Sequence, residues 1–437
     1  MPAVIENDTL VYKGSNLFRQ RLLLSTLSGR AIRIVDIRNS HNNPGLKEFE
    51  VNLIRLMDKI TNGSRVELNE TGTSLYYQPG ILIGGQVTHS CCPQRGIGYY
   101  LELLLALGPF CKEPLNAVLQ GVTHHDLDVS VDKIKTAALP ILLKFILVDD
   151  GLELKVVRRG APPLGGGEVV FKCPVRRHLR PLQWTKWGLV KRIRGVVYAL
   201  RVSPTMANRV VESAKGVSFR FEKFFQSARN VLCICNIIVC IFQVMLKFLP
   251  DVYINTDQCR GSNAGKSPGF GVSLVAETNE KTFYCAEAHG ARLTWCEASI
   301  DIIIIFFFFC MEICKTSHAI EICQFSTDLV LQIFTISETG AWRAARVLLR
   351  SVRSLIYSSR AIFIFEFTMH FSIVGPLSDY TIKFLQHLKE FFGVMFKLEV
   401  MRKDDDEESD EEKAATAQTV KMTCVGIGYV NISKRTL

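Results

Sequence analysis

The chain is organised around the stretch Val156-Val-Arg-Arg-Gly-Ala-Pro-Pro-Leu-Gly-Gly-Gly-Glu-Val-Val-Phe-Lys-Cys-Pro-Val-Arg-Arg177. It predicts a strand that ends in Arg158 and Arg159, a Pro/Gly turn, a second strand over 168–172, and then Arg176 and Arg177. The three glycines of the turn allow positive φ angles, or the close approach of another backbone or a phosphate. The sequence therefore predicts a β-hairpin flanked by two arginine pairs, which make a cationic surface.

On the N-terminal side of this hairpin, helices and strands alternate in an order that occurs twice. A leucine stripe at helical spacing predicts a helix over 15–28, and alternating apolar residues predict a strand over 31–37. A helix over 45–60 and short strands over 65–68 and 74–77 complete the order α-β-α-β-β. The order recurs as a helix over 96–107, a strand over 115–122, a helix over 129–145, and hairpin strands over 152–158 and 168–171.

A third, incomplete copy of this order lies near the C-terminus. Helices are predicted over 341–357 and 380–392, and a strand over 394–400 is expected to pair with one over 421–429. The spacing between matching helix starts, at Gly45 and Val129, is roughly the size of one α/β repeat unit. Three copies of one α/β unit predict a pseudo-threefold domain.

Different material separates the second copy from the third. Strands are predicted over 191–202, 251–255 and 271–277, and Ser203 is expected to cap a helix that runs through residue 215. This pattern predicts a small inserted α/β domain. The resulting division places repeats one and two in 1–187, the inserted domain in 188–288, an atypical apolar segment with part of repeat three in 289–374, and the end of repeat three in 375–437.

Two strongly apolar stretches, 231–249 and 302–309, do not fit this division. The second is shorter than the roughly 20 apolar residues that span a bilayer, and polar residues interrupt the first. We favour the hypothesis that 217–243 and 293–338 are translated intron. The acidic run over 404–412 is expected to be a solvated loop inside the last hairpin.

The formal net charge of +10 favours a polyanionic partner, RNA or DNA before an anionic membrane. Positioned lysines and arginines suffice for contacts with a phosphate backbone, and a solvated basic face is the alternative for each of them. The candidates are Arg19, Arg38, Arg158, Arg159, Arg176, Arg177, Lys191, Arg192, Arg194 and Lys266. The 14 cysteines are spaced irregularly and lack paired Cys-x-x-Cys motifs, so we expect free thiols, no metal site and no cofactor.

Two further motifs invite functional interpretations that their details weaken. The run Gly261-Ser-Asn-Ala-Gly-Lys-Ser267 suggests a phosphate-binding loop, but it has one residue too few between its glycines, and Pro268 stands where a helix should continue. The histidines and aspartates of 124–128 could form a metal site or an acid–base pair. We expect instead a capping loop before the helix at Val129, and we predict no catalytic residue.

Several groups of residues carry a resemblance to a known family. They are Leu22-Leu-Leu-Ser-Thr-Leu-Ser-Gly29, Ile37-Arg38 with Pro44-Gly-Leu46, Val157-Arg-Arg-Gly160 with Gly165-Gly-Gly-Glu168, Arg201-Val-Ser-Pro204, and Gly265-Lys-Ser-Pro-Gly-Phe-Gly271. Together they resemble the RNA 3′-terminal phosphate cyclase family, over about residues 10–215, 244–288 and 375–437. The resemblance implies an α/β (α+β) fold in which three βαβαββ-type repeats form a large domain with a small inserted α/β domain.

Within that family the chain is most similar to a non-catalytic, cyclase-like branch. Active members carry a Glu-Gly-Gly-Gly-Gln run where this chain has Tyr12-Lys-Gly-Ser-Asn16. Of the arginines that hold phosphates in active members, Arg19 and Arg38 match, but a third position falls on His41. The family's nucleophilic histidine has no recognisable motif here, although His370 lies in the corresponding region. The resemblance therefore implies that adenylyl transfer is lost.

The same resemblance implies a scaffold in ribosome biogenesis, located in the nucleolus. It implies that the protein joins the small-subunit processome, binds a ribosome-assembly GTPase and pre-rRNA, and supports the early cleavages that release 18S rRNA. No membrane partner is expected. Two alternatives stay open: an endonuclease that cuts pre-rRNA directly, although the sequence offers no paired carboxylates or metal cluster for it, and an active RNA 3′-phosphate cyclase.

Overall fold

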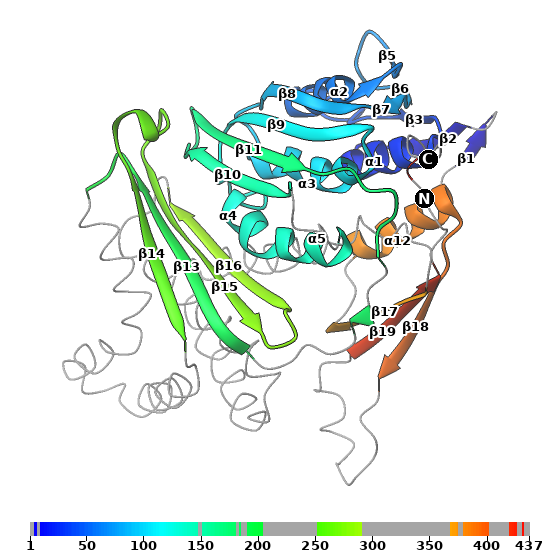
Figure 1. Cartoon of the computed structure of the whole chain (residues 1–437). Coiled ribbons are helices and arrows are strands. Elements are labelled where there is room, and N and C mark those ends of the chain that lie inside the picture. Colours follow the sequence, from blue (N-terminus) through cyan, green and yellow to red (C-terminus); the bar gives the residue numbers. More distant parts are fainter. Residues whose placement is uncertain are drawn as a thin grey trace, which may run out of the picture.

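The structure is a computed structural model that describes residues 4–6, 9–146, 151–180, 183–184, 190–203, 251–290, 368–374, 379–401, 419–425 and 431. In these ranges the strands form four sheets of four or five strands and one two-stranded pair. Figure 1 shows the sheets of the first two repeats side by side, with α1, α3, α5 and α12 beneath them and the inserted sheet at one end.

The first repeat is a mixed sheet with two helices. The strands are β1 (Val4–Glu6), β2 (Thr9–Lys13), β3 (Ile32–Val35), β5 (Arg65–Leu68) and β6 (Leu75–Gln78), and the helices are α1 (Phe18–Ser28) and α2 (Glu48–Ile60). In the order β1-β2-β3-β6-β5, β2 and β3 run parallel, whereas β6 runs antiparallel to both of its neighbours. A small antiparallel pair, β4 (Thr61–Asn62) and β7 (Ile81–Leu82), closes the repeat.

The second repeat contains the β-hairpin with the Pro/Gly turn that the sequence predicts. Its elements are β8 (Gly84–Ser90), α3 (Ile97–Leu107), a 3-10 turn (Gly108–Phe110), β9 (Glu113–Gly121), α4 (Val131–Lys133), a π-helical segment (Ile134–Ala138), α5 (Leu139–Ile146), β10 (Glu153–Arg158) and β11 (Gly167–Cys173). The sheet order is β10-β11-β9-β8, with β8 parallel to β9. The predicted hairpin and the helix expected over 129–145 are confirmed, the helix with one wider turn in its middle.

The third repeat is assembled from segments far apart in the sequence. Its described elements are β12 (Gln183–Trp184), β17 (Thr368–Val374), α12 (Asp379–Phe392), β18 (Phe396–Met401) and β19 (Thr419–Val425). The order is β12-β17-β19-β18, in which β12 and β17 run parallel and the other pairs run antiparallel. The predicted helix over 380–392 and the predicted last hairpin are both confirmed.

All three sheets share one strand order. Apart from β1, which pairs antiparallel with β2 at the edge of the first sheet, the first two strands of each repeat are parallel, and the fourth strand lies between the second and the third. This topology confirms the α/β fold of three βαβαββ-type repeats. The opening strands β2, β8 and β12 are missing from the order read from the residues, because they are short or carry few β-branched residues.

The insertion is a fourth sheet of its own. It consists of β13 (Val190–Leu200), β14 (Val252–Cys259), β15 (Gly269–Thr278) and β16 (Phe283–Gly290), in the order β14-β13-β15-β16. Only β13 and β14 run parallel among its pairs. Because β12 precedes β13 in the chain and β17 follows β16, this sheet lies within the span of the third repeat.

Helices α2 and α3 show how burial follows sequence. In α3 ten of the eleven residues are buried, because apolar residues face every direction and the helix packs between neighbours. In α2 the apolar stripe is one-sided: Leu53, Leu56 and Met57 are buried, whereas Arg55 and Lys59 are exposed. Each fully buried leucine stabilises the fold by about 1.5–3 kcal/mol relative to an exposed one.

Several sequence predictions fall outside the described residues. They concern the helices over 203–215 and 341–357, the candidate intron segments 217–243 and 293–338, and the acidic run over 404–412. Among the residues that are described, none of the helices combines the length and the apolar character needed to span a membrane.

Candidate functional site

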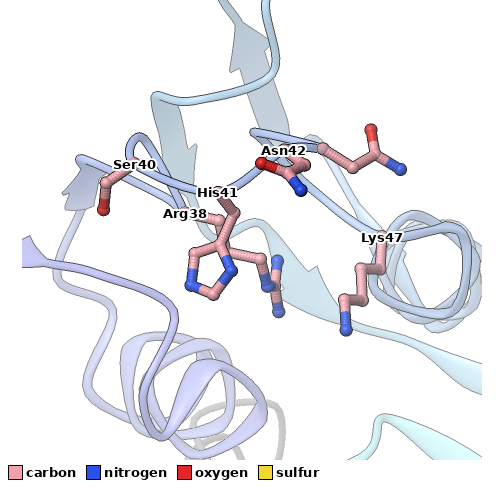
Figure 2. Close-up of a pocket in the computed structure, with 6 residues that line it drawn as sticks. Arg38, Ser40, His41, Asn42 and Lys47 are labelled. Atoms are coloured by element: carbon pink, nitrogen blue, oxygen red, sulfur yellow. The ribbon is translucent and has the colours of Figure 1, made fainter.

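The loop between β3 and α2 borders an open hollow of about 530 Å³. Gly45 permits the turn of this loop, because its φ is +85° and a Cβ there would lie 3.0 Å from the backbone of Gly72. In Figure 2 the side chains of Arg38, His41 and Lys47 extend to the same side of the loop. The lining consists of Arg38, Ser40, His41, Asn42, Asn43 and Lys47.

Within this hollow, the guanidinium of Arg38 is already bound by a carboxylate. Its Nη1 donates to Glu50 Oε2 at 2.7 Å and its Nη2 donates to Glu50 Oε1 at 2.5 Å. Nη1 also donates to the carbonyl oxygen of Gly45 at 2.9 Å. Glu50 Oε2 accepts a further hydrogen bond from the backbone N–H of Lys47 at 2.8 Å, which satisfies a free donor at the start of α2.

Two more arginines lie over the ring of Tyr99 on α3. The guanidinium carbon of Arg19 is 4.6 Å from the ring centroid, and that of Arg95 is 4.3 Å away. Arg19 pairs with Glu102 and donates to the carbonyl oxygen of Tyr99 at 3.0 Å. Arg95 binds both carboxylate oxygens of Asp128, with Nε 2.8 Å from Oδ2. Burial raises the pKa of the Tyr99 phenol to about 12, so the ring is neutral.

These ion pairs form one contiguous group. The ring of Phe49, next to Glu50 on α2, meets the ring of Tyr99 edge-on at 5.6 Å, and the guanidinium of Arg95 lies 5.0 Å from it. The side chains of the arginines and carboxylates are between 3% and 21% exposed, so bulk water screens them only partly. We call this group the paired-arginine cluster; its members are Arg19–Glu102, Arg38–Glu50 and Arg95–Asp128.

The structure thus brings together Arg19 and Arg38, the two residues on which the family resemblance placed phosphate contacts. The residue pattern did not point to Arg95, Glu50 or Glu102, and it singled out Asp128 only as part of a possible metal site, acid–base pair or capping loop. One signal was present for Glu50, because it is the third residue of α2, the position at which a glutamate closes a capping box. The other pairs join separate elements, so the residue pattern alone gives no sign of them.

The glycine turn of the β10–β11 hairpin lies against the loop that precedes β15. Gly165 and Gly166 have φ angles of +65° and +83°. The backbone N–H of Lys266 donates to Gly165 O at 2.9 Å, and a Cβ on Gly166 would lie 3.0 Å from the backbone nitrogen of Lys266. The sequence left open whether this glycine turn approaches another backbone or a phosphate, and in the structure it approaches the backbone of the loop before β15.

Arg159 ties the same two regions together through its side chain. It is 4% exposed, so it adds nothing to an exposed cationic surface. Its Nη1 and Nη2 donate to Asp132 at 2.6 and 2.9 Å, and its Nε donates to Asp257 on β14 at 2.6 Å. Its guanidinium also lies 5.5 Å from the ring centroid of Tyr198 on β13. We call Arg159, Asp132, Asp257 and Tyr198, with the neighbouring His124 and His289, the joint cluster.

The histidines of the joint cluster are packed between the second repeat and the inserted sheet. His124 Nε2 lies 2.8 Å from Asp132 Oδ2, and its ring centroid is 4.2 Å from that of Tyr198 and 5.1 Å from that of His289. Burial alone would oppose ionisation of Asp132, but His124 and Arg159 hold the pKa of its carboxyl well below the usual range. The capping role expected of this loop belongs to Ser130, whose Oγ accepts from the N–H of Lys133.

The remaining candidate cations lie elsewhere. Arg192 pairs with Glu277 at 2.6 Å, and Arg194 pairs with Asp251 at 2.5 Å, both on the inserted sheet. The side chain of Arg158 is 40% exposed, with Glu168 at 3.6 Å. Exposed or partly exposed positions are held by Arg176, Arg177, Lys191 and Lys266. The ten candidates therefore do not form a single surface.

The glycine run over 261–267 does not begin a helix. Residues Gly261–Asn263 form a short 3-10 turn, and β15 begins at Gly269. The carbonyl oxygen of Gly265 accepts from Arg201 Nε at 2.7 Å, and the backbone N–H of Gly265 donates to the carbonyl oxygen of Arg159 at 2.7 Å. The weak phosphate-binding-loop interpretation is therefore not supported, and this loop forms part of the contact between the second repeat and the insertion.

The seven cysteines that the structure describes are buried free thiols. Burial raises the pKa of Cys111 to about 12 and that of Cys259 to about 11, which keeps both as neutral thiols. Among the described residues, no group of three or more His, Cys, Asp and Glu side chains is placed to hold a metal ion.

Comparisons with known proteins agree with this architecture. The family model described as RNA 3′-terminal phosphate cyclase matches residues 10–398. A probable RNA 3′-terminal phosphate cyclase-like protein of Drosophila melanogaster is 44% identical over 439 residues, which cover 100% of both chains. The human RNA 3′-terminal phosphate cyclase-like protein is 45% identical over 98% of both chains. The rRNA processing protein rcl1 of Schizosaccharomyces pombe is 34% identical over 97% of both chains. The chain belongs to the RNA 3′-terminal phosphate cyclase family.

Proposed function

We propose that this chain is a non-catalytic, cyclase-like scaffold that supports rRNA processing for the small ribosomal subunit. The observation that carries the proposal is the match to the Schizosaccharomyces pombe rRNA processing protein, at 34% identity over 97% of both chains. Because that match extends over nearly the whole of both chains, the shared role belongs to the complete arrangement of repeats and insertion.

The finer part of the proposal concerns place and partners. The chain acts in the nucleolus as a member of the small-subunit processome, binds a ribosome-assembly GTPase, and supports the early pre-rRNA cleavages that yield 18S rRNA. The formal net charge of +10 supports an RNA partner, because lysines and arginines that neutralise phosphates release the counterions condensed on the nucleic acid.

The hollow beside α2 supplies a direct contact for RNA. Lys47 is exposed, and among the described residues no carboxylate pairs with its ammonium group. His41, Asn42 and Asn43 are exposed beside it, and amides donate hydrogen bonds to phosphate and sugar oxygens. This combination suits sequence-independent contact with an RNA backbone.

The segment before α1 supports the absence of cyclase chemistry. Gly14 is the one glycine in the run Tyr12–Asn16, and both of its backbone polar groups are used inside the fold. Its N–H donates to Val35 O at 2.8 Å, and its carbonyl oxygen accepts from Arg21 Nη1 at 2.7 Å. This glycine therefore offers no free N–H group to a nucleotide phosphate.

The test is affinity purification of the full chain from cells, followed by identification of the bound proteins and RNA. We expect a ribosome-assembly GTPase, pre-rRNA and processome proteins, together with accumulation of uncleaved precursor when the chain is depleted. Purified chain incubated with ATP and RNA carrying a 3′-phosphate should form no cyclic end. Cyclic ends would overturn the non-catalytic part, and cleavage of pre-rRNA by the purified chain alone would favour the endonuclease.

A further inference from the structure

Each arginine of the paired-arginine cluster has one carboxylate of its own. Arg19 is paired with Glu102, Arg38 with Glu50, and Arg95 with Asp128. Three positive and three negative side chains leave the cluster with no formal net charge. The arginines that could attract a phosphate are therefore neutralised before any ligand arrives.

Glu50 occupies the positions that the oxygens of an anion would take. Its two oxygens accept from both terminal nitrogens of Arg38, and Oε2 also accepts the N–H of Lys47 at the start of α2. A guanidinium fork and a free N–H at a helix N-terminus are the groups that commonly bind phosphate. Here the chain fills both with its own carboxylate.

Burial makes it difficult for an external anion to displace Glu50 from Arg38. The side chain of Glu50 is 3% exposed and that of Arg38 is 15% exposed, so a second anion near this guanidinium would meet the carboxylate at short range with little water between them. The repulsion grows with the charge of the ligand. A phosphate monoester or a polyphosphate is therefore opposed more strongly than a phosphodiester that carries one charge.

We propose that Glu50 and Glu102 determine which phosphates can bind at the paired-arginine cluster and the hollow beside it. They exclude a 3′-terminal phosphate and the polyphosphate of a nucleoside triphosphate, and they leave the singly charged phosphodiesters of internal RNA backbone as the ligand class. The RNA part of this inference rests on the proposed function, whereas the exclusion of highly charged phosphates does not require RNA.

The first test compares two RNAs of one sequence, one ending in a 3′-hydroxyl and one in a 3′-phosphate. Binding to the unmodified full chain is measured by fluorescence anisotropy. We expect dissociation constants that agree within about twofold, because internal phosphodiesters make the contacts. A preference of tenfold or more for the phosphorylated end overturns the proposal.

The second test uses inorganic pyrophosphate and isothermal titration calorimetry. Glu50→Gln keeps the shape of the side chain and removes its charge, and we expect it to bind pyrophosphate about tenfold more tightly than the unmodified chain. Glu102→Gln should gain affinity in the same direction through Arg19. The matched control is Glu48→Gln, which removes an exposed acidic charge from the same turn of α2 and should change affinity less than twofold.

Different outcomes contradict the selectivity inference and the proposed function. Equal pyrophosphate affinity in Glu50→Gln, Glu102→Gln and Glu48→Gln, with circular dichroism confirming that all three are folded, overturns the selectivity inference even if RNA binds. Absence of RNA binding by the unmodified chain counts against the proposed function, while the pyrophosphate titrations still decide the role of the carboxylates. If Glu50→Gln does not fold, Glu102→Gln and the comparison of RNA ends decide it.

Discussion

The paired-arginine cluster and the joint cluster both hold arginines on carboxylates, yet they differ in what the ion pairs connect. Arg38 faces an open hollow and is bound by one carboxylate from the neighbouring helix of its own repeat. Arg159 is bound by two carboxylates, Asp132 of the second repeat and Asp257 of the inserted sheet. The first arrangement sets the charge of a surface, whereas the second joins two parts of the fold. We therefore expect variants of the paired-arginine cluster and its hollow to change ligand binding, and variants of the joint cluster to change the free energy of unfolding.

Removal of Arg159 should have the largest effect on stability. Arg159→Met leaves Asp132 buried without the guanidinium that donates to both of its oxygens, and breaking a buried pair in this way costs about 3–5 kcal/mol. We expect that loss in the free energy of unfolding measured with urea. Arg158→Met is the matched control: its side chain is 40% exposed, so the change should stay within about 0.5 kcal/mol. Equal losses in the two variants would contradict the distinction between the regions.

A smaller loss is expected when the backbone contact between the hairpin and the inserted loop is obstructed. Gly265→Ala places a Cβ 2.7 Å from the Cα of Gly160 and against Gly165 O, so the two segments must separate, at about 2–3 kcal/mol. Gly261→Ala in the same loop is the control, because its φ is +58° but nothing lies within 4 Å of a Cβ there. It should show only the cost of the left-handed conformation, about 1 kcal/mol. Thermal unfolding of both variants measures the difference.

Acidification should weaken the joint cluster. Burial lowers the pKa of His289 to about 4, below the ordinary 6.5, so the unfolded chain binds a proton more readily than the folded chain between these values. The stability linked to this histidine is therefore complete above about pH 6.5 and is lost as the pH falls toward 4. Between pH 7.5 and pH 5 we expect a loss of about 2 kcal/mol from this group.

A variant at His289 separates the pH-dependent stability of this histidine from that of other groups. His289→Gln cannot titrate, so its free energy of unfolding should fall less than that of the unmodified chain between pH 7.5 and pH 5. Burial also raises the pKa of Tyr198, so its hydroxyl, 3.3 Å from His289 Nδ1, does not titrate in this range. Urea titrations at the two pH values provide the measurement, and parallel losses in both proteins would refute the assignment to His289.

The elements of the fold also differ in how far the sequence could predict them. The hairpin, α2 and α12 follow from local signals, namely glycine turns, capping residues and apolar spacing. Strand β8 carries two glycines and few β-branched residues, so its alternation is weak, and its place in the sheet comes from its pairing with β9. Local patterns therefore define the helices better than the opening strand of each repeat.

For the candidate site, the sequence pointed to Arg19 and Arg38 but not to Arg95, and it did not show that these arginines are paired with carboxylates. An arginine in the segment that follows a strand has a similar local pattern whether it is solvated, like Arg177, or buried, like Arg159. The difference is made by Asp257, which lies 98 positions away in the chain and approaches only when the insertion packs against the second repeat. Glu102 reaches Arg19 in the same way, through the packing of α1 against α3.

The smallest predicted effect concerns Lys47, an exposed residue that lines the hollow beside the paired-arginine cluster. Lys47→Ala should leave stability unchanged within about 0.5 kcal/mol, because the side chain is exposed. It should weaken RNA binding about three- to fivefold for any sequence and reduce the slope of log affinity against log salt by about one, as expected for one lost phosphate contact. The control is Lys59→Ala, on the last turn of the same helix, which removes an exposed lysine whose Nζ donates to Thr88 O at 2.7 Å. It should change neither the affinity for RNA nor the salt slope. Equal salt slopes for Lys47→Ala and the unmodified chain would remove the hollow from the RNA-binding surface and leave the exposed Arg177 as the next position to test.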